Sequence, residues 1–205
     1  MYISEKLFSG DIKDIDINDL DGKLVVGNII QLNKFLEQNP QLIQSLQSAF
    51  GADGGLDLVS GGPPCQSFSM AGLRQLDNDR NTLPWEFAHF VELTKPKFAL
   101  LENVSGILKA FETNGEKFYA WFEVAKVFAQ IGYIPLSLHV NAKYAGVAQN
   151  RPRFLLLAIR EDIFNQISTR LTSTEHLIFK KPVSLFSAIK EERKIEVSEY
   201  EYLDI

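Results

Sequence analysis

Residues 61–69 read Gly61-Gly62-Pro63-Pro64-Cys65-Gln66-Ser67-Phe68-Ser69 and follow a short apolar run, residues 56–60. That run predicts a buried strand. Because proline fixes φ and has no backbone N–H, the strand must end at the Gly-Gly-Pro-Pro turn. In open α/β sheets, ligands bind at the carboxyl ends of the strands, and this turn would present Cys65 there. The stretch therefore predicts an α/β fold with a functional turn at a strand end.

Cys65 is the only cysteine in the chain, which excludes an internal disulfide and a cysteine-rich zinc site. A lone cysteine is ordinarily a small buried apolar side chain. Here it follows a rigid turn and precedes a run of polar residues, a setting that suits a nucleophile held on a stiff loop. Both interpretations stay open on these residues alone.

Two more strands carry polar residues at the same predicted edge. The apolar run Phe98–Leu101 leads into Glu102-Asn103-Val104, and Gln149-Asn150-Arg151-Pro152-Arg153 leads into the apolar run 154–159. A carboxylate at the end of a buried strand needs a partner or a function, so Glu102 is either a structural ion pair or a catalytic group. The arginines are either solvated strand ends or groups that point toward Cys65.

The remaining pattern predicts helices and one further strand. Residues 24–50 have helical spacing with a break at Asn39-Pro40. A helix with Pro84 in its first turn, capped by Asp79 or Asn81, should end before Lys95. Residues 111–130 predict an amphipathic helix that ends at Gly132, residues 134–140 alternate as a strand, and residues 180–189 predict a turn and short helix. The charged tail, residues 190–205, is expected to be poorly ordered.

Four of these stretches together resemble the cytosine-5 DNA methyltransferases. Pro63–Ser69 resembles the catalytic loop of that family, and three further matches follow in the family's order, at residues 79–83, 101–104 and 149–153. The similarity covers roughly Gly10 to Arg160, about three quarters of the chain.

The resemblance implies an incomplete Rossmann-like, S-adenosylmethionine-dependent methyltransferase domain of the α/β class with a mostly parallel sheet. The partial catalytic domain would span residues 1–160, with a possible helical insertion at 24–50, and residues 161–205 would be a C-terminal extension. The glycine-rich cofactor motif and the target-recognition domain of complete members have no counterpart in this sequence.

The resemblance also assigns roles to individual residues. In the implied reaction the thiolate adds to C6 of cytosine, and C5 then takes the methyl group of S-adenosylmethionine. No metal is needed. The implied catalytic residues are Cys65, Glu102, Asn103 (which would orient Glu102), Arg151 and Arg153; the cofactor-binding residues are Asp11, Pro64 and Leu83; the substrate-binding residues are Gln66, Ser67, Ser69 and Gln149.

Charge bears on the partners. The formal net charge is −5, whereas a stand-alone DNA-binding protein normally presents a basic face. The resemblance implies DNA as the substrate. It also implies a second polypeptide that carries the missing cofactor motif and DNA reader, and the acidic charge of this chain is consistent with a DNA-binding surface on that missing part. The leading function is DNA cytosine-5 methylation in a restriction–modification system. The alternatives are a tRNA cytosine-5 methyltransferase and an inactive fragment or non-catalytic subunit that docks to a partner. With no signal peptide or long apolar run in this sequence, we expect a cytoplasmic protein without membrane contact.

Overall fold

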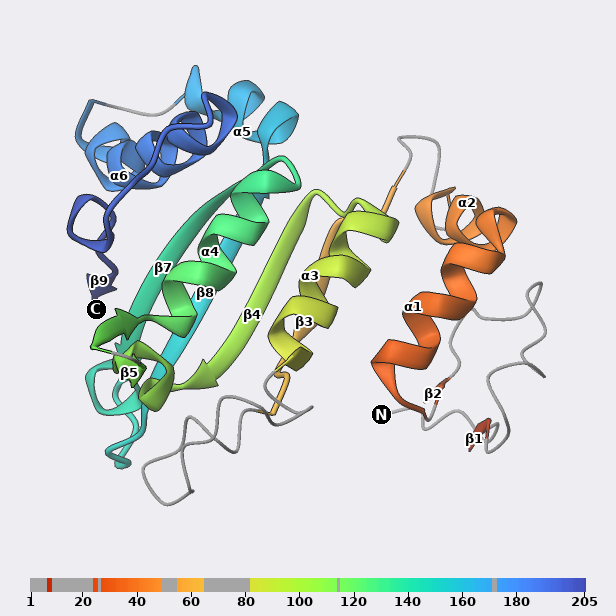
Figure 1. Ribbon diagram of the computed structural model, residues 1–205, viewed down its shortest axis with the longest axis horizontal. Coiled ribbons are helices and arrows are strands. Elements are labelled where there is room, and N and C mark those ends of the chain that lie inside the picture. Colours follow the sequence, from red (N-terminus) through yellow and green to blue (C-terminus); the bar gives the residue numbers. More distant parts are fainter. Residues whose placement is uncertain are drawn as a thin grey trace.

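The computed structural model describes residues 7–8, 24–25, 27–48, 55–64, 82–113, 115–170 and 173–205. Its centre is a five-stranded sheet of order β3-β4-β8-β7-β9 (Figure 1). These strands are β3 (Leu58–Gly61), β4 (Phe98–Val104), β8 (Pro152–Arg160), β7 (Tyr133–Asn141) and β9 (Leu203–Asp204). β3 is parallel to β4 and β9 to β7, and only β8 opposes its neighbours. The prediction of a mostly parallel α/β sheet is confirmed.

Helices flank this sheet. They are α1 (Ile29–Gln38), α2 (Pro40–Ser48), α3 (Leu83–Thr94), α4 (Ala120–Gln130), α5 (Glu161–Ser168) and α6 (Ser173–Lys190). α4 packs on β7, α3 and α6 pack on α4, and α1 packs on α3 (Figure 1). A short parallel pair, β1 (Leu7–Phe8) and β2 (Leu24–Val25), completes the N-terminal part. None of the helices that the structure describes combines the length and apolarity needed to cross a bilayer.

The core lies where the sheet meets α3, α4 and α6. Burial alternates along β4, so Ala99 and Leu101 are fully buried while their neighbours are only partly covered. Leu156 and Ala158 of β8 continue the buried layer beside them. Alternation of this kind places successive side chains on opposite faces. Glu102 and Asn103, at the end of β4, therefore point to opposite faces of the sheet.

β3 is a strand as predicted, but it is not buried. Its residues are exposed and half-buried in alternation, and Leu58 is 53% exposed. The reason is position: β3 is the outermost strand of the five-stranded sheet. An apolar run alone predicts a strand without telling a central strand from an edge strand.

The helical prediction for residues 24–50 is confirmed for α1 and α2, which are separated at Asn39 just before Pro40. Whether these helices are an insertion relative to other proteins stays a prediction. α3 ends at Lys95 as expected, in a left-handed conformation with φ of 49°. Its N-cap is Thr82 rather than Asp79 or Asn81, and the Thr82 side chain makes no capping hydrogen bond.

The helix predicted over residues 111–130 is wrong in its first half. Residues 111–118 form a hairpin of β5 (Phe111–Thr113) and β6 (Glu116–Phe118), with Phe111 opposite Phe118. Gly115 has φ of +80°, a turn conformation that suits glycine. The helix α4 occupies only the second half, and Gly132 follows it with φ of +90°.

Two other expectations differ from the structure. Burial does not alternate along β7, because its first five residues are all buried between layers. The tail was expected to be poorly ordered, but it packs on the sheet: Tyr200 is fully buried and donates its hydroxyl to the Pro135 carbonyl at 2.9 Å. Burial raises the pKa of Tyr200 well above its usual value. β9 then pairs with β7 beside Leu138.

Candidate functional site

Three strand ends converge at one edge of the sheet. β3 and β4 are parallel, with Gly61 beside Leu101, so both carboxyl ends lie at this edge. β8 runs the other way, so its beginning lies there too, with Arg153 opposite Val104. The topology thus brings together the Gly61–Pro64 turn, the Glu102–Asn103 pair and Arg153, although Gly61 and Arg153 are 92 residues apart in sequence.

Glu102 and Arg153 form an ion pair. Arg153 Nε lies 2.7 Å from Glu102 Oε1, with 21% of the arginine side chain and 45% of the glutamate side chain exposed. Because Arg153 is registered opposite Val104, it is the diagonal neighbour of Glu102 on the same face of the sheet. Arg153 Nε is buried and makes no hydrogen bond within the described residues, so the contact is an ion pair without an aligned N–H. Arg153 Nη1 donates to the Pro152 carbonyl at 2.9 Å.

Asn103 points to the opposite, buried face and is 3% exposed. Its Nδ2 donates to the Pro63 carbonyl at 3.3 Å, and its Oδ1 accepts from the Val104 N–H at 2.7 Å. Asn103 therefore ties the end of β4 to the turn that precedes Cys65. That Asn103 orients Glu102 stays a prediction.

Asn141, at the end of β7, is a residue that the sequence interpretation missed. Its Oδ1 accepts from the Lys143 N–H at 3.3 Å and the Arg151 N–H at 3.2 Å, and its Nδ2 donates to Asn150 Oδ1 at 2.9 Å. It fixes the segment that leads into Arg153. The available signal was an asparagine directly after a strand, since such side chains commonly bind local backbone groups in turns.

The other predicted residues of this segment are exposed. Arg151 and Gln149 both lie at the surface before β8. Within the described part of the chain, Arg151 forms no ion pair with Glu102, unlike Arg153. Both stay candidates for contact with a substrate rather than with the protein.

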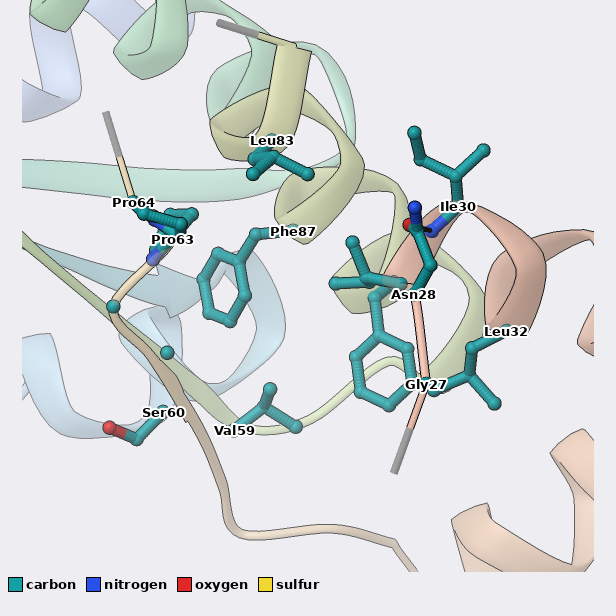
Figure 2. A pocket seen from close by; sticks show the side chains of 14 residues that line it. Gly27, Asn28, Ile30, Leu32, Val59, Ser60, Pro63, Pro64, Leu83 and Phe87 are labelled. Atoms are coloured by element: carbon teal, nitrogen blue, oxygen red, sulfur yellow. Dashed lines mark hydrogen bonds between the residues drawn. The ribbon is translucent and has the colours of Figure 1, made fainter. Parts of the chain in front are cut away.

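A cavity of about 740 Å³ adjoins the same edge. Figure 2 shows Pro63, Pro64 and Leu83 on one side, Asn28, Ile30 and Leu32 on the other, and Phe87 between them. The walls are mostly apolar side chains with the backbone of Gly61 and Gly62 exposed among them. Two predicted cofactor-binding residues, Pro64 and Leu83, thus line one cavity, and its volume is in the range of small-molecule sites.

Several predicted site residues cannot be placed. Asp11, Cys65, Gln66, Ser67 and Ser69 lie outside the described residues. Pro64, which precedes Cys65 in sequence, is described and lines the cavity. Across the described ranges, no cluster of three or more His, Cys, Asp or Glu side chains is arranged to hold a metal ion.

Gly61 has a packing reason to be glycine, and this gives a stability prediction. A Cβ at Gly61 would lie 2.5 Å from Phe87 Cε2, and Phe87 is 4% exposed in the core. We expect Gly61→Ala to lower the free energy of unfolding by about 1–3 kcal/mol, measured by urea denaturation. The double variant Gly61→Ala, Phe87→Leu should be less destabilised than the sum of the two single variants.

Gly62→Ala is the matched control, because a Cβ there would meet Glu102 Oε2, in a flexible side chain, at 3.3 Å and the Glu102 backbone oxygen only at 4.0 Å. Gly62→Ala should lower the free energy of unfolding by less than Gly61→Ala does. Equal urea midpoints for Gly61→Ala and the unmodified chain would contradict the packing argument.

Comparison with known proteins gives consistent matches. A family model described as C-5 cytosine-specific DNA methylase matches residues 32–203. The type II methyltransferase M.DdeI of Desulfomicrobium norvegicum is 36% identical over 146 residues, which are 70% of this chain and 34% of that protein. The type II methyltransferase M.NgoPII of Neisseria gonorrhoeae is 41% identical over 109 residues, 53% of this chain and 30% of that protein. The chain spans about a third of the length of these curated relatives.

Among solved structures, one is of a proposed DNA modification methyltransferase encoded within a prophage (E. coli). It is 29% identical and superposes with a TM-score of 0.41, over 52% of this chain and 27% of that one.

Proposed function

The chain belongs to the C-5 cytosine-specific DNA methylase family, and on this basis we propose that it carries the catalytic centre for methyl transfer to C5 of cytosine in DNA. The observation that carries the proposal is the Glu102–Arg153 pair beside the turn that leads to Cys65. Fold alone would not support a reaction, but a carboxylate and a guanidinium beside the turn that precedes a candidate nucleophile in sequence do.

Cys65 is the proposed nucleophile. Cytosine C5 is a weak nucleophile, and addition of the Cys65 thiolate to C6 makes the C4–C5 side of the ring electron-rich. C5 then takes the methyl group, the C5 proton leaves to a base, and the C6–sulfur bond breaks to release thiolate and 5-methylcytosine. The thiolate is the reactive form of cysteine, so a nearby cation favours the step.

Glu102 is proposed to hold N3 and the exocyclic amino group of the base through its carboxyl, so that charge entering the ring is drained at N3. Arg153 holds Glu102 in place through the 2.7 Å contact of its Nε. The other guanidinium N–H groups of this side chain, which is 21% exposed, are proposed to donate to the base carbonyl. Arg151, exposed two residues earlier, is proposed to bind a flanking phosphate.

S-adenosylmethionine is the proposed methyl donor, and the residues of the cavity fit it. The apolar walls formed by Pro64, Leu83 and Ile30 suit a flat purine ring. The bound sulfonium would supply the methyl group. Asp11, implied to bind the adenine amino group, lies outside the described residues and stays a prediction.

The proposed setting is a restriction–modification system, supported by the type II methyltransferases to which the chain is similar. The chain spans about a third of the length of those relatives. We therefore also propose that additional protein sequence supplies the remaining cofactor contacts and target recognition. That sequence would belong to a partner or to a longer form of the chain.

Covalent trapping tests this function. The purified chain is mixed with S-adenosylmethionine and duplex DNA that carries 5-fluorocytosine, whose fluorine prevents release of the enzyme. We expect a denaturation-stable protein–DNA adduct, either with the chain alone or after addition of lysate from its source cell. Cys65→Ser should abolish the adduct because the hydroxyl is a far weaker nucleophile than the thiolate.

The adduct band must contain this chain, which an affinity tag establishes. Single-stranded, duplex and tRNA substrates are compared in parallel. An adduct with tRNA alone would show that the substrate is RNA rather than DNA. If the soluble chain forms no adduct under any of these conditions, catalysis by this chain would be refuted.

A further inference from the structure

The segment between Ile131 and Arg160 has an unusual charge composition. It contains Lys143, Arg151, Arg153 and Arg160 and no aspartate or glutamate, in a chain with 26 acidic residues and a net charge of −5. Most of this segment is β7, β8 and their connection, residues 142–151, here called the β7–β8 loop. The loop is therefore a locally basic surface on an acidic chain.

The β7–β8 loop has a defined shape. Asn141 binds the backbone N–H groups of Lys143 and Arg151, and the Ala142 N–H donates to the Arg151 carbonyl at 3.3 Å. A short 3-10 turn at Ala142–Ala145 ends at Gly146, whose φ is +79°. These contacts close the two ends of the loop together, so Lys143 and Arg151 emerge from adjacent positions.

The loop presents an aromatic ring and two cations to solvent. Tyr144 is 73% exposed and Val147 is 52% exposed, in contrast to the other tyrosines of the sheet and tail. Lys143 Nζ lies 4.6 Å from the centre of the Tyr144 ring, a cation–π contact. Within the described residues, neither Lys143 nor Arg151 is paired with a carboxylate.

This surface continues outward from the candidate site. Arg151 lies two positions before Arg153, directly before Pro152, the first residue of β8. Arg153 contacts Glu102. A polyanion bound at the site would therefore pass next to Arg151 and Lys143.

We propose that Lys143, Tyr144 and Arg151 form a docking surface for the sugar–phosphate backbone of duplex DNA next to the target cytosine. Lys143 and Arg151 hold a phosphate, and the Tyr144 ring packs on the neighbouring sugar. This rests on the proposed function, since it takes DNA as the substrate. A protein partner fits less well, because interface cores are depleted in lysine and these cations have no acidic counterpart. Because these side chains are proposed to contact phosphate and sugar rather than base edges, the contact would be independent of sequence.

Two measurements test the surface without requiring catalysis. Lysine acetylation with and without duplex DNA, followed by mass spectrometry, reports protection of each lysine. Fluorescence anisotropy of a labelled duplex, at several salt concentrations, reports affinity and its salt dependence. Lys97 is the control, because it precedes β4 at the other end of the strand, about 17 Å from Glu102 at ~3.3 Å per residue, and pairs with Asp57 at 2.7 Å.

We expect DNA to protect Lys143 but not Lys97 from acetylation. Lys143→Ala should lower the affinity for DNA roughly eightfold at 0.1 M salt. It should also reduce the slope of log affinity against log salt concentration by about one, as for one lost phosphate contact. Lys97→Ala should change neither. Tyr144→Ala should weaken binding about fivefold with the slope unchanged, and Tyr144→Phe should bind as the unmodified chain does.

Equal acetylation of Lys143 with and without DNA would overturn the surface, as would equal affinities of Lys143→Ala and Lys97→Ala or no duplex binding at the lowest salt. Protection of Lys143 by rising protein concentration without DNA would assign the face to a second copy of the chain and also overturn it. A Cys65 adduct without Lys143 protection would leave the proposed function standing and reject this surface. Lys143 protection without any adduct would support the surface and reject the catalysis.

Discussion

Glu102→Gln is expected to slow formation of the 5-fluorocytosine adduct by about 10²–10⁴-fold, the range typical of a lost acid–base group. Glutamine keeps the size and polarity of the side chain but cannot deliver a proton to N3. Stability should change little, because 45% of the Glu102 side chain is exposed and such ion pairs contribute about 1 kcal/mol or less. The rate is measured by quenching the trapping reaction in denaturant at intervals.

Glu112→Gln is the matched control, since Glu112 is an exposed glutamate on β5. Its adduct rate should equal that of the unmodified chain. If adduct forms only with source-cell lysate, the two variants are compared under that condition. Equal rates for Glu102→Gln and Glu112→Gln would show that Glu102 is only a structural partner of Arg153, the alternative that the sequence left open.

The sequence contained enough information to predict that Pro64 and Glu102 meet at the sheet edge. Each follows an apolar run, and the carboxyl ends of parallel strands share an edge. Arg153 precedes its apolar run, so a parallel strand would have placed it at the opposite edge, and only the antiparallel direction of β8 brings it to Glu102. Which arginine contacts Glu102 could not be predicted. That depends on register, which places Arg153 opposite Val104 and leaves Arg151 outside the strand.

Local ambiguity explains the misassigned helix. Phe111, Phe118 and Phe122 fit an apolar helix face, yet the first two are cross-strand partners in a hairpin. Gly115, with φ of +80°, marks the turn, but a single glycine within a periodic pattern is weak evidence against a helix. Only α4, which begins at Ala120, has the packing partners that make the helix favourable.

In the C-terminal tail the sequence pattern led to the opposite error, because its many charged residues predicted disorder in a segment that packs on the sheet. Residues 190–205 are rich in charge, but Ile195 and Tyr200 are buried and Trp121 lies 5.7 Å from Tyr200 between ring centres. A few apolar anchors suffice when the rest of the segment can stay solvated. Composition averaged over sixteen residues does not reveal them.

Asn103→Asp is expected to lower the free energy of unfolding by about 3 kcal/mol, although the two side chains have nearly the same shape. In the native chain Nδ2 donates to the Pro63 carbonyl at 3.3 Å, and Asn103 is 3% exposed. Aspartate would replace that donor with an acceptor, so two oxygens would face each other and a charge would be buried beside them. Removing one partner of a buried polar pair and burying an unpaired charge are both costly. Urea denaturation measures the change.

Asn103→Ala separates the two contributions. It loses both the bond to the Pro63 carbonyl and the bond from the Val104 N–H but introduces no charge, so it should cost about 1–2 kcal/mol and fall between the unmodified chain and Asn103→Asp. Under conditions where all three remain folded, both variants should also trap 5-fluorocytosine more slowly, because the Pro63 turn that leads to Cys65 is no longer tied to β4. Adduct rates that match the unmodified chain, in variants shown to be destabilised, would mean that Asn103 supports the sheet but does not position the nucleophile. An Asn103→Asp variant as stable as Asn103→Ala would instead show that the aspartate is accommodated as a neutral acid that donates to the Pro63 carbonyl, and raising the pH should then restore the difference between the two variants.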